Sequence, residues 1–263
     1  MKYLAITILA SLLLAACNDN SGPSGQDRAK LEILHNLETQ VKQFPDSASL
    51  RMRYVNALDS LQMYPEALAQ TDSMIKRDSL NNGLWFAKGQ LFESNKDTLN
   101  AIASYEKALS IYPSVEAQLN LANLYAEKGN VRALAICQNV SQMGLGRETD
   151  AACDFIAGVY HSREGDNAKA IAFFDRAINN NYTLMEAYME KGFIYYGTKD
   201  FAQALKTFET AITINNTYAD AYYWQAKTYE AMGNKDEAVL NYERALGLDN
   251  QLAEAREAIK RLN

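Results

Sequence analysis

The sequence predicts an all-α fold, a solenoid of repeated helix pairs, and three observations support this prediction. The chain has 263 residues but only 4 prolines and 13 glycines, so few residues interrupt helices. Alanine and leucine are frequent and β-branched clusters are rare, which favours helices over strands. Equivalent residues recur with a period of 34. A fixed period of this size is typical of solenoids, in which each repeat packs against its neighbours.

Composition and charge exclude several classes of function. The chain is 48% hydrophobic and 22% charged, as in an ordinary globular protein. Its net charge of −6 and pI of about 5.1 argue against a nucleic-acid partner, which requires clustered Lys and Arg. The 3 cysteines and 2 histidines form no CxxC or HExxH motif, and no nucleotide-binding or nucleophile motif occurs. We therefore expect no metal, no cofactor and no catalytic residue, and hence no enzyme.

Residues 1–16 have the features of a signal peptide. Lys2 gives a positive start, and Leu4 to Ala16 is a stretch of 13 residues whose only polar members are Thr7 and Ser11. A bilayer-spanning helix needs about 20 apolar residues, so this stretch is too short to be one. Its length is that of the apolar region of an export signal.

The signal ends in the sequence Leu-Ala-Ala before Cys17. This ending resembles the bacterial lipobox, and the resemblance implies cleavage before Cys17 and lipidation of its sulfur. The alternative is an ordinary secretory signal followed by a chance cysteine. Each buried acyl methylene contributes about 0.8 kcal/mol, so the two or three chains of a lipoprotein anchor it stably. Residues 17–26 are then the lipidated cysteine and a flexible tether.

The residue after the lipobox is Asn18, not the aspartate that favours inner-membrane retention in enterobacteria-like sorting. The resemblance therefore implies a lipid-anchored protein of the bacterial cell envelope, in the outer membrane and facing the periplasm. Inner versus outer membrane and the choice of leaflet stay open, because the sorting rule varies between bacterial groups.

The repeats begin well after the tether. The best copy starts at Asn82 and carries, in order, Trp85, Gly89, Phe92, Ala101, Tyr105, Ala108 and Pro113. This pattern resembles the tetratricopeptide repeat, although Lys88 stands where the family has leucine. The resemblance implies a right-handed superhelix of about six helix-turn-helix repeats. The predicted repeats are residues 48–81, 82–114, 115–150, 151–184, 185–218 and 219–252, between capping helices at 27–47 and 253–263.

Within each repeat, a small residue is expected where the second helix approaches the first. These residues are Gly89, Ala122, Gly158, Gly192 and Ala226. Turns are expected at 128–130, 164–166 and 232–234, where glycine tolerates the positive φ of a helix end. The third repeat is the weakest, and its residues 143–150 are expected to form an enlarged loop.

Apolar positions on the first helices of repeats four to six should line the concave face. They are Phe155, Val159, Met189, Phe193, Tyr196 and Tyr223. Exposed apolar patches mark interaction sites, so this strip predicts a groove for an extended or helical peptide. The alternative is that these side chains pack against neighbouring repeats. Under the groove hypothesis, Phe193→Asp should abolish partner binding without loss of helicity.

Three further side chains call for an interpretation. Cys137 and Cys153 fall on neighbouring helices, where they form either a disulfide, as an oxidising compartment allows, or two buried thiols. His161 occupies a position held by tyrosine in other repeats, so we interpret it as a packing residue rather than a catalytic base.

A lipobox followed by about six repeats is similar to known envelope lipoproteins that serve as pilotins, assembly factors or adaptors. The resemblance implies a non-catalytic scaffold or adaptor that binds protein or peptide partners and is held to the membrane by its N-terminal lipid. The alternative is a dedicated secretion, pilus or outer-membrane assembly factor with one obligate partner. The oligomeric state, monomer or homodimer, stays open.

Overall fold

The structure is a computed structural model that describes residues 25–263, with side chains from residue 28 onward. In this range the chain is all-α, as predicted, and contains no strand. The helices are α1 (Gly25–Gln43), α2 (Ala48–Ser60), α3 (Tyr64–Arg77), α4 (Asn82–Ser94), α5 (Thr98–Ile111), α6 (Val115–Glu127), α7 (Arg132–Gln142), α8 (Arg147–Arg163), α9 (Asn167–Asn180), α10 (Met185–Gly197), α11 (Phe201–Ile214), α12 (Ala219–Ala231), α13 (Lys235–Leu248) and α14 (Ala253–Leu262). The predicted signal peptide and Cys17 lie outside the described residues.

The chain forms two compact units, and the first contains α1, α2, α3 and residues Gln90–Asp97, which include the end of α4. Its core consists of Val55, Leu58, Ala67 and Leu91. Leu34 of α1 and Met52 of α2 are partly buried against this core. Helix α1 therefore covers apolar surface of the first helix pair, as a capping helix does.

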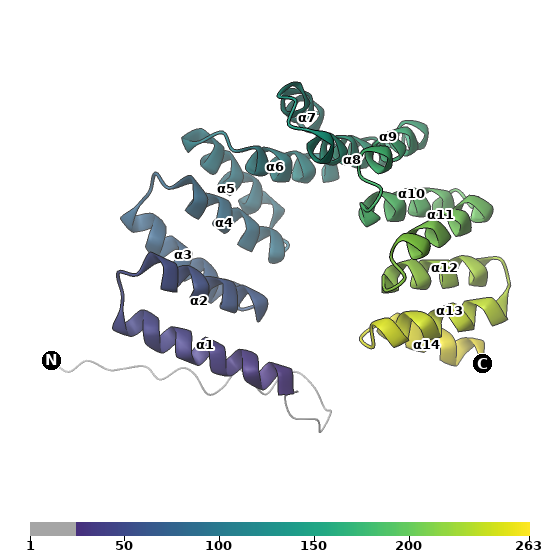
Figure 1. Cartoon of the computed structure of the whole chain (residues 1–263), viewed down its shortest axis with the longest axis horizontal. Helices are drawn as coiled ribbons and strands as arrows, with labels where there is room; N and C mark the ends of the chain where they lie inside the picture. Colours follow the sequence, from purple (N-terminus) through teal and green to yellow (C-terminus); the bar gives the residue numbers. More distant parts are fainter. Residues whose placement is uncertain (1–24) are drawn as a thin grey trace. The chain divides into compact units, whose positions relative to one another are not determined.

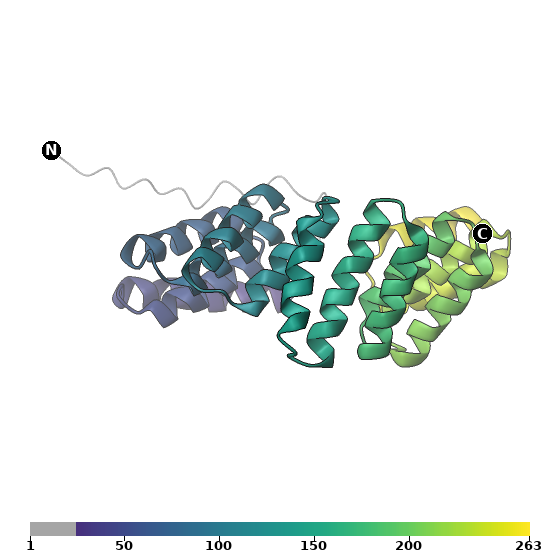
Figure 2. The same ribbon diagram turned by 90° about the horizontal axis from the view of Figure 1, so that it is seen from above.

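The second unit contains residues Asn81–Gly89, which include the start of α4, and all helices from α5 to α14. Each helix from α5 onward contacts the next helix in the chain. Figures 1 and 2 show the two helices of a pair, such as α8 and α9, lying side by side. Contact between consecutive elements along the chain is the organisation of an α-solenoid.

Glycine in the first helix of a pair allows an aromatic ring of the second helix to approach its backbone. A Cβ added to Gly192 of α10 would lie 2.3 Å from Cε1 of Phe208, and one added to Gly158 of α8 would lie 2.5 Å from Cε1 of Phe174. Both distances are too short for a real contact, so only glycine fits beside these rings in their present positions. The structure thus confirms the small position predicted for the first helix.

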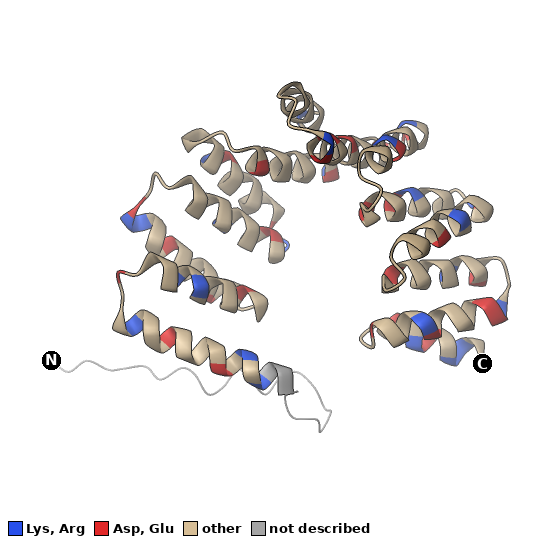
Figure 3. Cartoon of the chain, viewed as in Figure 1, with Lys and Arg blue, Asp and Glu red and all other residues tan. Residues whose placement is uncertain are grey.

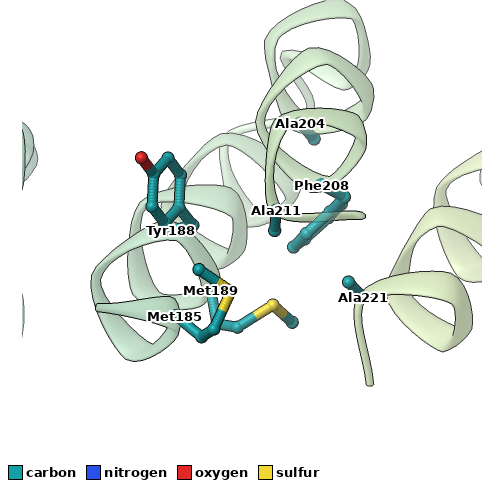
Figure 4. Close-up of a cluster of buried hydrophobic side chains, with 7 residues drawn as sticks. All are labelled: Met185, Tyr188, Met189, Ala204, Phe208, Ala211 and Ala221. Atoms are coloured by element: carbon teal, nitrogen blue, oxygen red, sulfur yellow. The ribbon is translucent and has the colours of Figure 1, made fainter. Parts of the chain in front are cut away.

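Buried side chains also join one repeat to the next. One cluster contains Met185, Tyr188, Met189, Ala204, Phe208, Ala211 and Ala221. Figure 4 shows Met185 and Met189 of α10 and Phe208 of α11 pointing into the space that they share, with Ala221 of α12 beside it. The core is therefore continuous from the α10–α11 pair to the following pair, which gives the solenoid its cohesion.

The largest difference from the sequence analysis is at the start of α8. This helix begins at Arg147, so residues 147–150 are helical and the connection from α7 is only residues 143–146. The expectation of an enlarged loop over 143–150 was therefore wrong. Glu148 and Asp150 lie in the first turn of α8, where acidic side chains interact favourably with the helix dipole. Similarly, α1 begins at Gly25, inside the predicted tether.

Three tight turns confirm the predicted glycine positions. Gly129, Gly165 and Gly233 have φ of 64°, 78° and 81°. At the equivalent position between α10 and α11, Lys199 adopts φ of 63°. The turn geometry is therefore kept even where the side chain does not favour it, because the packing of the helix pair determines the turn.

Helix α14 covers the last pair of the second unit. Its buried Ala255 and Ala258 pack in one cluster with Tyr223 of α12 and Tyr242 of α13. This is the role expected of a C-terminal capping helix. In the part of the chain that the structure describes, every helix is too short or too polar to cross a lipid bilayer.

Candidate functional site

The structure corrects the predicted apolar strip. Val159, Met189 and Tyr223 are buried, with exposed fractions of 1%, 4% and 9%. Phe155, Phe193 and Tyr196 are half-buried. Val159 and Met189 therefore cannot line an open groove. The alternative reading, that side chains of the strip pack against neighbouring repeats, describes Met189, which shares a cluster with Ala221 of the next repeat.

Aromatic packing between repeats explains why much of the strip is covered. The ring of Phe193 lies 4.5 Å from the ring of Trp224 in the next repeat, measured between centroids, and 6.2 Å from that of Phe208. Phe155 packs against Phe174 of its own repeat, with centroids 5.7 Å apart. Replacing Phe193 by aspartate would therefore disturb the core as well as any groove, so it is not a clean test of binding.

An open groove exists further along the chain, between α10, α12, α13 and α14. It has a cavity volume of about 750 Å³. We call it the C-terminal groove and define it by six of the residues that line it: Tyr196, Tyr223, Lys227, Glu230, Glu254 and Arg261. Tyr196 and Tyr223 are members of the predicted strip, and the other four residues were not predicted.

Two acidic side chains of the groove, Glu230 and Glu254, are held by tyrosine and arginine. Tyr223 Oη donates a hydrogen bond to Glu254 Oε2 at 2.5 Å and so links α12 to the capping helix. Glu230 Oε2 accepts a hydrogen bond of 2.8 Å from Tyr242 Oη, and Glu230 Oε1 lies 2.7 Å from Arg261 Nη2. These contacts fix the side chains before any ligand arrives, which lowers the entropy cost of binding.

Burial and the neighbouring carboxylates keep both tyrosines neutral. Burial, reinforced by the hydrogen bond to Glu254, raises the pKa of Tyr223 well above its ordinary value of 10.0. Burial and the hydrogen bond to Glu230 raise the pKa of Tyr242 in the same way. The groove therefore presents neutral aromatic surface at physiological pH, and both tyrosine hydroxyl groups already donate to carboxylates of the protein.

Lys227 is the cation of the groove that no carboxylate neutralises. Its ammonium lies 4.4 Å from the ring centroid of Trp224 and 5.5 Å from that of Tyr223. No ion pair to Lys227 occurs among the residues that the structure describes. A half-buried ammonium held over two aromatic rings has donors left for an anionic group of a ligand.

Within residues 28–263, the other charged side chains are mixed in sign. Figure 3 shows Lys and Arg interspersed with Asp and Glu along the helices. Nucleic-acid binding needs a continuous basic stripe, and this distribution does not provide one. No group of three or more His, Cys, Asp or Glu side chains within residues 28–263 could hold a metal ion.

The remaining predicted site residues lie apart from the groove. Cys137 of α7 and Cys153 of α8 are both free and buried, so here the structure shows the thiol alternative rather than the disulfide. His161 stacks on Phe173 of α9, with centroids 5.3 Å apart, as expected of a packing residue. The predicted lipidation at Cys17 falls outside the described residues.

The predicted strip contains only two residues of the C-terminal groove, because only apolar side chains were considered as candidates for it. Lys227 follows Phe193 by 34 residues, so it occupies an equivalent position, and this was the available signal. Glu254 and Arg261 belong to the capping helix. That helix has no counterpart in the repeat frame, so the period could not place them.

Comparisons with known proteins agree with this fold. The profile of the Tetratricopeptide repeat family matches residues 83–114, 186–218 and 219–252. No curated protein matches the chain. Among solved structures, a tetratricopeptide repeat protein from Parabacteroides merdae is similar with a TM-score of 0.72 and 16% identity, over 90% of this chain and 93% of that one.

Two further crystal structures share the fold at low sequence identity. PilW, described as a widely conserved type IV pilus biogenesis factor, has a TM-score of 0.64 and 18% identity, over 81% of this chain and 98% of its own. A thermophilic protein of Thermus thermophilus has a TM-score of 0.55 and 18% identity, over 69% of this chain and 98% of its own. The repeated helix pairs, the small positions beneath aromatic rings and these matches lead to one conclusion: the chain contains tetratricopeptide repeats.

Proposed function

We propose that this chain is a membrane-anchored, non-catalytic scaffold of the bacterial cell envelope that binds a segment of a partner protein in the C-terminal groove. Repeat proteins of this kind use their extended surfaces for protein binding. The observation that carries the proposal is the groove itself, in which neutral aromatic surface lies beside an ammonium without a carboxylate partner.

The geometry of the groove indicates the chemistry of the bound segment. Tyr196 and Tyr223 offer apolar contact, and fixed carboxylates of Glu230 and Glu254 accept hydrogen bonds from Arg261, Tyr242 and Tyr223 rather than from a ligand. Lys227 supplies positive charge. A segment with an apolar side chain and a nearby acidic group therefore fits the groove, in an extended or helical conformation.

Crosslinked pull-down from intact cells tests the groove. Lys227→Gln removes the ammonium and keeps the apolar stem, and the matched control is Lys206→Gln, at an exposed position of α11 outside the groove. A lost hydrogen bond to a charged group costs about 1.5–3 kcal/mol, so affinity should fall roughly tenfold to a hundredfold for the Lys227 variant alone. Equal recovery of the partner with both variants would refute binding in the groove.

The same pull-down addresses the rival function. A single stoichiometric partner in the outer membrane supports a dedicated assembly factor, whereas several partners support a general scaffold. The anchor rests on the lipobox resemblance of residues 14–17 and has its own test. Cys17→Ser should move the protein from the membrane fraction to the soluble fraction and abolish labelling by a clickable fatty acid. Retained labelling would exclude Cys17 as the lipidation site.

A further inference from the structure

Two thiols meet between α7 and α8, away from the C-terminal groove. Cys137 and Cys153 interact through a side-chain hydrogen bond and have exposed fractions of 5% and 4%. Both line a hollow with a volume of about 450 Å³, together with Ser141, Phe173 and Arg176. The two sulfur atoms are therefore near each other and border a space that a small molecule can enter.

The surroundings make the two thiols unequal. The hydrogen bond from Cys137 lowers the pKa of the Cys153 thiol, and a hydrogen bond with Ser141 acts in the same direction, while burial and the charges of Asp150 and Asp154 oppose them. The same pairing and burial raise the pKa of the Cys137 thiol. The hydrogen bond with Ser141 is made by Cys153 and stabilises its thiolate. Because the thiolate is the nucleophile in disulfide exchange, Cys153 is the residue that should attack first.

We propose that Cys137 and Cys153 form a reversible redox site, in which a small external disulfide oxidises the two thiols to an intramolecular disulfide. Cys153 Sγ, as thiolate, attacks one sulfur of the external disulfide and releases the other half as a thiolate. Cys137 Sγ then loses its proton and attacks Cys153 Sγ, which releases the second half. One dithiol is oxidised, one disulfide is reduced to two thiols, and no further oxidant is needed.

The new bond would join α7 to α8 across the short connection at residues 143–146. This is where the third and fourth repeats meet, and it is the place where the helix lengths depart most from the other repeats, since α7 has 11 residues and α8 has 17. Oxidation would restrict motion between these two helices. The proposal does not depend on what the C-terminal groove binds.

Incubation of the native full-length protein with 2-hydroxyethyl disulfide tests the proposal. This reagent is small and neutral, so Asp150 and Asp154 do not repel it. We expect mass spectrometry to show the loss of two hydrogen atoms from Cys137 and Cys153, with no adduct retained on either of them. Peptide mapping should find Cys137 joined to Cys153, and dithiothreitol should reverse the change. Mapping also counts any reaction at Cys17 separately.

Two variants separate the roles of the thiols. With Cys137→Ser, the mixed disulfide on Cys153 has no second thiol to resolve it and should accumulate. With Cys153→Ser, Cys137 should react at least tenfold more slowly. Stable adducts on both Cys137 and Cys153 of the native chain would overturn the proposal. So would an absence of reaction in the native chain when both cysteines react after denaturation.

Discussion

At the scale of single residues, the close contact between Gly192 and Phe208 sets how near two helices approach. We expect Gly192→Ala to lower the free energy of unfolding by about 1–3 kcal/mol, because the added methyl must displace a buried ring. Gly197→Ala in the same helix is the control, since nothing lies within 4 Å of its added Cβ. Its effect should stay within about 0.5 kcal/mol. Urea denaturation measures both, and equal stability of the two variants would show that the ring moves freely.

Glu190 of α10 provides a prediction about pH. Burial raises its pKa above the ordinary value of 4.5, with Arg163 opposing the shift and Glu127 adding to it. Folding therefore favours the protonated form. The stability from this preference is fully present below the unfolded-state pKa and is lost as the pH rises through the folded-state pKa.

Glu190→Gln should accordingly raise the melting temperature at neutral pH, and the gain should vanish below pH 4.5, the ordinary carboxyl value. Glu209→Gln, at an exposed position of α11, is the matched control and should show no such pH dependence. Thermal melts monitored by circular dichroism at both pH values measure the difference. A gain for Glu190→Gln that is the same at both pH values would contradict the predicted linkage.

At the scale of elements, equivalent helices begin in different ways. Asp200 caps α11 by accepting a hydrogen bond of 3.2 Å from the backbone N–H of Gln203. Asn234 stands 34 residues later, at the start of α13, and its side chain makes no capping hydrogen bond. The two helices therefore allow a matched comparison between an N-cap side chain that accepts a hydrogen bond, in α11, and one that does not, in α13.

Asp200→Ala should cost about 1 kcal/mol and increase hydrogen exchange in the first turn of α11, because the N–H of Gln203 loses its acceptor. Asn234→Ala should change the exchange of α13 much less, since no such bond is lost. Native-state hydrogen exchange resolves each helix separately in a solenoid, where stability is local. Equal effects at the two helices would argue against the side-chain cap as the cause.

The elements also show where sequence periodicity is and is not sufficient. Five of the first helices, α2, α4, α6, α10 and α12, begin at or next to their predicted repeat starts, at residues 48, 82, 115, 185 and 219. These starts are predictable because the small and aromatic positions recur every 34 residues. Helix α8 starts earlier, at residue 147, since the acidic first turn is a local signal that the period does not contain.

At the scale of the whole molecule, the fold class followed from the sequence because a repeat must bury its apolar face against a neighbour. The candidate site could not be predicted from the sequence as directly as the fold class. In the repeat pattern, an apolar position on a first helix can serve either packing or binding. Only the folded structure shows that Met189 belongs to the core and that Lys227 faces a groove. Glu254 and Arg261 of α14, which bind Tyr223 and Glu230, lie outside the repeat pattern.

The position of Lys227 over Trp224 has a consequence for how binding can be observed. The sequence has 2 tryptophans, and only Trp224 lies under this ammonium. A ligand group that draws Lys227 away would change the electric field at the indole and hence its emission. With Trp85 replaced by phenylalanine, the protein would carry a native optical reporter of groove occupancy that needs no attached dye.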